Sequence, residues 1–152
     1  MSSMRGFEFR ELMDGTVRMK DSERPFRFDF EVRGPSRWLV WFHWLGEMTG
    51  TATIDGYVME SPARGELETA PVRGWMRYAF SFKGPEGESL TFAGRKRIRF
   101  LFVGWTTLRG NVVDASGNEI GTAVLYFRRE NFKPFVRSMR SIPRPKSAAR
   151  AG

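Results

Sequence analysis

The sequence predicts an all-β protein, an antiparallel up-and-down β-barrel of about eight strands. Apolar and polar residues alternate over long stretches, which is the period of a strand with one buried face. Short turns rich in glycine, proline, asparagine and serine join these stretches, so there is no room for crossover helices and antiparallel pairing is favoured. The chain of 152 residues is one domain's length, and a sheet with one apolar face must curl or fold over to bury it.

Each predicted strand follows from its own alternation. The clearest is FRFDFEV, in which four apolar residues alternate with three charged ones. The turns KGPEGES and ASGN each lie between two alternating stretches and predict two hairpins. The predicted strands are residues 7–19, 26–32, 48–54, 64–69, 75–83, 89–100, 106–114 and 119–128.

The segment 38–46, WLVWFHWLG, contains three of the five tryptophans and the only histidine. Ser36 can cap a short aromatic helix over 37–45, with Gly46 as its end. The segment is apolar on both sides, whether helix or strand, so it requires burial on both sides or a partner. It is either a core plug at one end of the barrel, or a lid or docking surface for a partner, a membrane or a second copy.

The C-terminal region combines an expected helix with a basic tail. Asn131 can cap an amphipathic helix over 131–140, with apolar residues at helical spacing. We expect one barrel domain, 1–140, followed by a disordered tail, 141–152, which is too poor in apolar residues to fold. Eight basic residues and one acid follow from Arg128 onward, and they account for most of the net charge of +8. A solvated tail explains them, and weak contact with acidic membranes is the functional alternative.

The composition excludes several classes of chemistry. The absence of cysteine excludes disulfides and thiolate sites and fits a reducing compartment. The single histidine, His43, has no motif around it, so we expect a packed or rim side chain rather than a metal ligand or catalytic base. The sequence shows no nucleophile with its base and no apolar run long enough for a signal peptide or a membrane helix. We therefore expect a cytoplasmic protein that is not an enzyme and uses no cofactor or metal.

Strand parity predicts that Lys96 points into the barrel, on the same face as Phe92. A buried ammonium is costly unless it is paired, so Lys96 is a candidate to hold the carboxylate or sulfate head group of a ligand, with Tyr78 donating a hydrogen bond to it. Gly94 can instead mark a bulge that turns Lys96 outward. The outward arginines at 95, 97 and 99 are typical of a solvated strand face, and nucleic acid is not favoured because aromatic residues do not alternate with them.

The succession of strands, turns and glycines resembles a known bacterial domain over nearly the whole chain up to Arg140. It is similar to the small lipocalin-like β domain found beside or fused to glucose–methanol–choline flavin oxidoreductases of the cholesterol-oxidase-like group. The resemblance implies an accessory role near an enzyme that oxidises sterols or other lipids. The chain has no G-x-G-x-x-G fingerprint, so it would not bind the flavin itself. The resemblance is carried by FRELMDGTV, PFRFDFEVRGPS, MTGTATIDG, RGELE, MRYAFSFKGPEGESLTFAGRK, TTLRGNVVDASGNEIGTAVLYF and FVRSMR.

We expect a non-catalytic protein that binds a hydrophobic small molecule, such as a sterol, a fatty acid or another lipid, inside a lipocalin-like barrel. A barrel of this size holds one small ligand or only its own side chains. The alternative is therefore an interaction module with a filled barrel, which docks through 38–45 on an enzyme such as a flavin oxidoreductase or on itself. The sequence leaves monomer and homodimer open. The predicted ligand-binding residues are Phe28, Phe30, Trp38, Trp41, Phe42, Met76, Tyr78, Phe80, Phe92 and Lys96.

Overall fold

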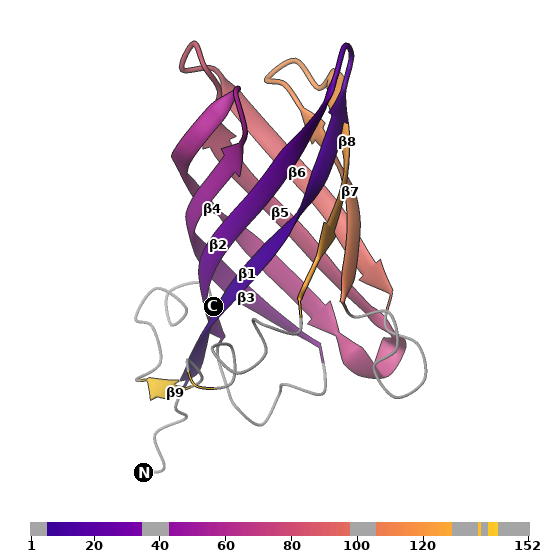
Figure 1. Cartoon of the computed structure of the whole chain (residues 1–152). Helices are drawn as coiled ribbons and strands as arrows, with labels where there is room; N and C mark the ends of the chain where they lie inside the picture. Colours follow the sequence, from indigo (N-terminus) through magenta and orange to yellow (C-terminus); the bar gives the residue numbers. More distant parts are fainter. Residues whose placement is uncertain (1–5, 35–42, 98–105, 129–136, 138–139, 143–152) are drawn as a thin grey trace.

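The computed structural model describes residues 6–34, 43–97, 106–128, 137 and 140–142. Within them, strands β1 to β8 each pair with the next, and β8 pairs back with β1, all antiparallel, so the sheet closes into an eight-stranded barrel (Figure 1). A further short strand, β9, pairs with the start of β1. The strands are β1 (Gly6–Met19), β2 (Glu23–Gly34), β3 (Trp44–Ile54), β4 (Val58–Ala70), β5 (Trp75–Lys83), β6 (Ser89–Arg97), β7 (Thr107–Val113), β8 (Glu119–Tyr126) and β9 (Arg140–Ile142).

The closed antiparallel barrel confirms the predicted fold class, but the predicted aromatic helix over 37–45 is wrong at its end. Trp44 and Leu45 are the first residues of β3, and Gly46 lies inside that strand. Trp44 is buried and Leu45 exposed, so they follow the two-residue period of the rest of β3 rather than a helical one. The remainder of 37–45, apart from His43, lies outside the described residues.

Helix is nearly absent from the part of the chain that the structure describes. It consists of η2 (Pro71–Arg73), which joins β4 to β5, and Arg137. Arg137 lies within the predicted C-terminal helix, whose other residues before Arg140 lie outside the described residues, and Arg140 begins β9 instead. Strand β9 includes Ser141 and Ile142, and 143–152 is not described. No helix in the described residues is long and apolar enough to cross a bilayer.

The two ends of the barrel differ. Tight turns join β1 to β2, β3 to β4, β5 to β6 and β7 to β8 at the end drawn uppermost in Figure 1, which we call the turn end. In the β7–β8 turn, Asp114 Oδ1 accepts hydrogen bonds from the backbone N–H groups of Ser116 and Asn118, both at 2.9 Å, and Gly117 has a φ of 85°. This is the hairpin that ASGN predicts. At the opposite end, the loop end, β4 and β5 are joined by η2.

A cluster of phenylalanine rings fills part of the interior. It follows from the alternation of β2, whose three inward phenylalanines meet those of β5 and β6 across the barrel. Ring centroids of neighbouring members lie 4.7 to 6.5 Å apart, which is contact distance for aromatic pairs. Side chains therefore occupy this region themselves. The members of this phenylalanine cluster are Phe26, Phe28, Phe30, Phe80, Phe82 and Phe92.

Candidate ligand site inside the barrel

Three polar side chains meet inside the barrel, between the phenylalanine cluster and the loop end. Lys96 Nζ donates a hydrogen bond to Glu11 Oε1 at 2.8 Å, and the two side chains are only 2% and 5% exposed. Tyr78 Oη lies 2.8 Å and 2.9 Å from the two carboxylate oxygens of Glu11 and donates to them. We call Glu11, Tyr78 and Lys96 the polar triad. It joins β1, β5 and β6 across the interior.

Lys96 points inward because the alternation of β6 runs without a break. The pairing of β5 with β6 has no register shift, and Phe92 and Lys96 are both buried. Gly94 therefore does not mark a bulge in the pairing of β5 with β6. Gly94 has another reason to lack a side chain: a Cβ there would lie 2.7 Å from the Phe92 ring and 2.8 Å from the Arg109 carbonyl oxygen.

The buried charges of the triad neutralise each other. The Lys96 ammonium also lies 4.9 Å from the centroid of the Tyr78 ring and 6.0 Å from that of Phe127, close enough for favourable cation–π contact. Burial and the adjacent Glu11 carboxylate raise the pKa of Tyr78 well above its ordinary value. Tyr78 therefore stays protonated at neutral pH and acts as a donor. Glu11 therefore supplies the counter-charge to Lys96 from within the chain, and a ligand head group bound by Lys96 stays a prediction.

Thr69 adds a polar group with an open hydrogen-bonding position. Its hydroxyl oxygen is buried and has no hydrogen-bond partner among the described residues, and Thr69 is 1% exposed. Its neighbours across the sheet are Trp44 on β3 and Met76 on β5, and Met76 pairs in turn with Lys96. All four residues are buried, so they form one row on the inner wall near the loop end. A buried hydroxyl without a partner costs roughly 1–3 kcal/mol, so the Thr69 hydroxyl has an open position for a hydrogen bond to a ligand or a water molecule.

The structure divides the predicted ligand-binding residues into three groups. Met76, Tyr78 and Lys96 belong to the inner wall near the loop end. Trp38, Trp41 and Phe42 lie outside the described residues. The others, Phe28, Phe30, Phe80 and Phe92, contact one another within the phenylalanine cluster. A ligand-binding role for any of them stays a prediction.

Sequence reasoning missed Glu11 and Thr69. Glu11 has the parity of Phe9 and Met13 on β1, and all three are buried, so the rule that found Lys96 would also have found its counter-charge. Thr69 shares its parity with the buried Leu67. The lack of a hydrogen-bond partner for its hydroxyl could not be inferred from the sequence, because it depends on the three-dimensional surroundings of one oxygen atom.

His43 lies on the surface at the loop end, as a rim histidine. Its Nε2 is 2.6 Å from Glu68 Oε2, and its side chain is 54% exposed. Arg77 also pairs with Glu68. The hydrogen bond with His43, aided by the charge of Arg77, lowers the pKa of Glu68. These contacts place His43 in a surface charge network with Glu68 and Arg77.

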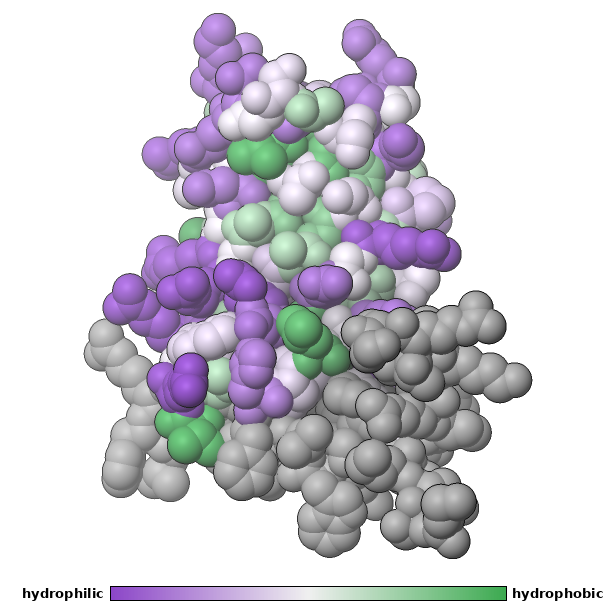
Figure 2. Space-filling view, turned by 180° about the vertical axis from the view of Figure 1, so that it is seen from behind, coloured by the Kyte–Doolittle hydropathy of each residue, from purple (hydrophilic) through white to green (hydrophobic). Residues whose placement is uncertain are grey.

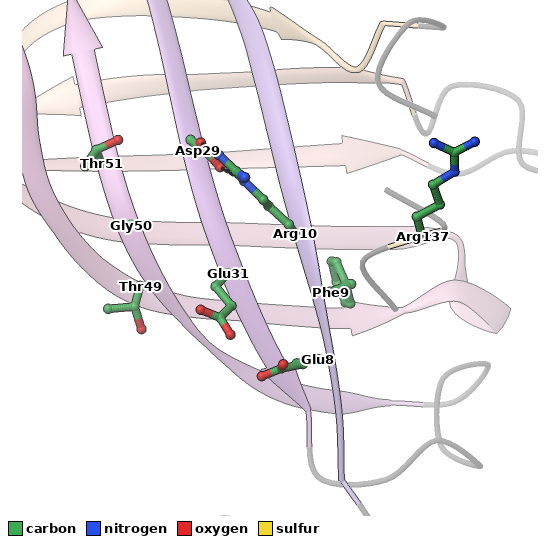
Figure 3. Close-up of a pocket in the computed structure, with 9 residues that line it drawn as sticks. All are labelled: Glu8, Phe9, Arg10, Asp29, Glu31, Thr49, Gly50, Thr51 and Arg137. Atoms are coloured by element: carbon green, nitrogen blue, oxygen red, sulfur yellow. Dashed lines mark hydrogen bonds and ion pairs between the residues drawn. The ribbon is translucent and has the colours of Figure 1, made fainter. Parts of the chain in front are cut away.

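A groove of about 520 Å³ lies on the outer side of β1, β2 and β3. Glu8, Arg10, Asp29, Glu31 and Arg137 are among the residues that line it (Figure 3). Arg10 forms an ion pair with Asp29, whose hydrogen bond and charge raise the pKa of Arg10. The Arg10–Asp29 ion pair thus neutralises part of the charge that lines this groove.

Neither a metal site nor a known relative identifies the function. Within the described residues, no three histidine, aspartate or glutamate side chains are grouped so as to hold a metal ion. Comparisons with protein families, curated proteins and solved structures found no match. The resemblance to the domain that accompanies flavin oxidoreductases stays a prediction. The inner wall near the loop end is therefore the candidate site, on its chemistry alone.

Proposed function

We propose that the protein is a non-catalytic, lipocalin-like barrel that binds one hydrophobic small molecule in its interior near the loop end. The observation that carries this proposal is the buried hydroxyl of Thr69, which has no hydrogen-bond partner among the described residues. Thr69 lies on the same wall as Lys96. Trp44 and Met76 make the rest of that row apolar. Small-molecule sites are typically apolar with a few placed polar groups, and this wall has that composition.

The pairing of Glu11 with Lys96 bears on the head group of the ligand. A fatty-acid carboxylate would have to displace Glu11 from Lys96 and leave a second carboxylate buried without its cation, which is costly. A neutral hydroxyl avoids this cost, because it can donate to a carboxylate oxygen or exchange a hydrogen bond with Thr69 while the ion pair remains intact. We therefore propose a sterol or another lipid alcohol as the ligand, in preference to a fatty acid.

Titration of the purified protein with cholesterol and with palmitate tests this proposal, with tryptophan fluorescence as the readout. Trp44 lies on the inner wall and is 5% exposed, so a ligand beside it should change its emission. We expect saturable binding of cholesterol and weaker binding of palmitate. Native mass spectrometry and organic extraction of protein purified from its source provide an independent readout. If neither lipid binds and no lipid is extracted, the proposal is wrong.

The second candidate function is an interaction module that docks through 38–45. The phenylalanine cluster, which fills part of the interior, and Leu45, which is 53% exposed, favour it. Trp44 would not contribute, because it is buried. Failure of both lipids to bind, together with self-association that Leu45→Ser abolishes in analytical ultracentrifugation, would support this function. Either function suits an accessory partner of a lipid-oxidising flavin enzyme, a proposal that rests on the resemblance of strands and turns.

A further inference from the structure

The outer face of β5, β6 and β7 carries only basic charges. The outward residues of these strands alternate with the buried ones, and none of them is acidic. We call this surface the basic face. Its charged members are Arg77, Lys83, Arg95, Arg97 and Arg109.

The outer face of β1 and β2 differs, because there acids and bases pair. Arg10 pairs with Asp29, and Arg33 lies 3.3 Å from Glu8 and 3.6 Å from Glu31. Opposite charges on neighbouring strands stabilise a sheet, whereas like charges directly opposite each other destabilise it. The basic face lacks this compensation within its own strands.

Three arginines of the basic face stand in one row across the sheet. Arg77 is directly opposite Arg95, and Arg95 is directly opposite Arg109. Like charges in these positions repel one another. Glu68 pairs with Arg77, but among the described residues no carboxylate forms an ion pair with Arg95, Arg97 or Arg109. The row leaves positive charge available to an anionic partner.

Two exposed aliphatic side chains lie near this row, toward the loop end. Leu45 is opposite Glu68, which is opposite Arg77, so Leu45 extends the row by two strands. Leu45 is 53% exposed, and Val72 of η2 is 73% exposed. Figure 2 views the barrel from the side of β5 and β6, and shows single hydrophobic side chains among hydrophilic ones toward the loop end. Basic residues beside exposed aliphatic ones are typical of surfaces that bind the membrane interface.

The only aromatic residue of the basic face, Trp75, is not available as a stacking platform for nucleic-acid bases. The Arg95 guanidinium lies 5.7 Å from the centroid of its ring, and the His43 ring lies 6.3 Å away. Single-stranded nucleic acid is held mainly by bases stacked on free aromatic faces, which this surface lacks. Exposed Leu45 and Val72 also have no role in contact with phosphates.

We propose that the basic face, together with Leu45 and Val72, docks the barrel on an anionic lipid bilayer. The arginines contact the lipid phosphate groups, and the two aliphatic side chains enter the interface between head groups and acyl chains. This orientation places the side of the barrel formed by β5, β6 and β7 against the membrane. The proposal does not depend on what the interior binds.

Partitioning of the full-length protein onto vesicles tests the proposal. The vesicles are phosphatidylcholine with and without phosphatidylglycerol. We expect the double variant R95Q/R109Q to lower the partition coefficient on anionic vesicles roughly 25-fold, the product of about a fivefold effect per basic residue. The variant removes a repulsion, so it should fold normally by circular dichroism. The control R18Q/R27Q removes the same charge from exposed positions on β1 and β2 and should leave partitioning nearly unchanged.

A second pair of measurements separates a bilayer from other anions. We expect L45S/V72S to weaken vesicle binding while leaving its dependence on salt intact, because it removes apolar contacts and no charge. Equal losses in R95Q/R109Q and R18Q/R27Q would overturn the proposal, since total charge would then explain the binding. An L45S/V72S variant that binds vesicles normally would also overturn the proposal. Binding to a single-stranded oligonucleotide is measured in parallel, and an R95Q/R109Q variant that loses only this binding and keeps vesicle binding would overturn the proposal as well.

Discussion

At the scale of single residues, the stability of the interior depends on the ion pair between Glu11 and Lys96. Both are almost fully buried, and their nitrogen and oxygen lie 2.8 Å apart. Tyr78 holds the carboxylate from another side. Removing one charge leaves the other buried without compensation, whereas replacing both with apolar residues of similar volume is often tolerated. The energetics of this pair are therefore strongly non-additive.

We predict that Lys96→Met lowers the free energy of unfolding by about 3–5 kcal/mol, because it leaves the Glu11 carboxylate without its cation. The double variant E11M/K96M should recover much of this loss, since it leaves no charge in the interior. Urea unfolding of the wild type, both single variants and the double variant measures the coupling energy. A coupling energy near zero would show that the two groups do not interact.

Tyr78 should make stability depend on pH in the alkaline range. Its pKa is raised in the folded state by burial and by Glu11, so the unfolded chain loses this proton first as pH rises. Its contribution is fully present below the ordinary tyrosine pKa of about 10 and decreases above it. We predict that Tyr78→Phe reduces the slope of unfolding free energy against pH above that value. Tyr126→Phe, at an exposed position, should keep the wild-type slope.

Thr69→Val should separate ligand affinity from stability. Among the described residues the Thr69 hydroxyl has no hydrogen-bond partner, so its removal should leave stability unchanged or raise it. Cholesterol affinity should fall about fivefold through one lost hydrogen bond of roughly 1 kcal/mol. Thr53→Val is the matched control: Thr53 is equally buried but accepts a bond from the Glu60 backbone N–H at 3.0 Å. It should lower stability and keep affinity. If Thr69→Val lowered stability and kept affinity, while Thr53→Val lowered affinity, Thr69 would not belong to the site.

At the scale of elements, alternation predicts a strand only where one face is apolar and the other polar. Strand β5 has that pattern, and its predicted bounds, 75–83, are those observed. The segment 38–45 is apolar on both sides, so its sequence shows no alternation that predicts a strand. Strand β3 nevertheless extends into it, because Trp44 pairs with Thr69. Strand β4 also begins earlier than predicted, at Val58, because the irregular stretch VMESPA hides its alternation around Glu60, which has a φ of 42°.

Gly46 has no side chain and so leaves room for the Trp44 ring at the start of β3. A Cβ at Gly46 would lie 2.6 Å from the Trp44 ring and 3.1 Å from the Arg33 carbonyl oxygen. We predict that Gly46→Ala lowers the free energy of unfolding by about 1–3 kcal/mol through overpacking. The additional substitution Trp44→Phe should recover part of the loss, because the smaller ring leaves room for the methyl group. Thermal unfolding of both variants measures this, and full additivity of the two effects would contradict the proposed contact.

At the scale of the whole molecule, parity assigns each residue to a face but does not say which inward residues meet. Glu11 and Lys96 are 85 residues apart, and closure of β8 onto β1 brings their strands around one interior. The sequence therefore predicts Lys96 and Tyr78 as inward polar groups, but not their ion pair or the open hydroxyl of Thr69. Closure also divides the interior into the phenylalanine cluster and the wall near the loop end.

This division predicts that the two parts of the interior respond differently to substitution. Phe80 contacts four other rings of the phenylalanine cluster, so Phe80→Ala should lower the free energy of unfolding by about 3–5 kcal/mol. It should leave cholesterol affinity per folded molecule unchanged, because the proposed ligand lies elsewhere. Met76→Trp places a larger side chain beside Thr69 and Lys96 and should lower affinity by about tenfold or more, as expected of overpacking. Denaturant unfolding gives the stabilities, and fluorescence titration gives the affinities. A folded Phe80→Ala variant that no longer binds cholesterol would locate the ligand among the phenylalanines, and the wall near the loop end would then not be the site.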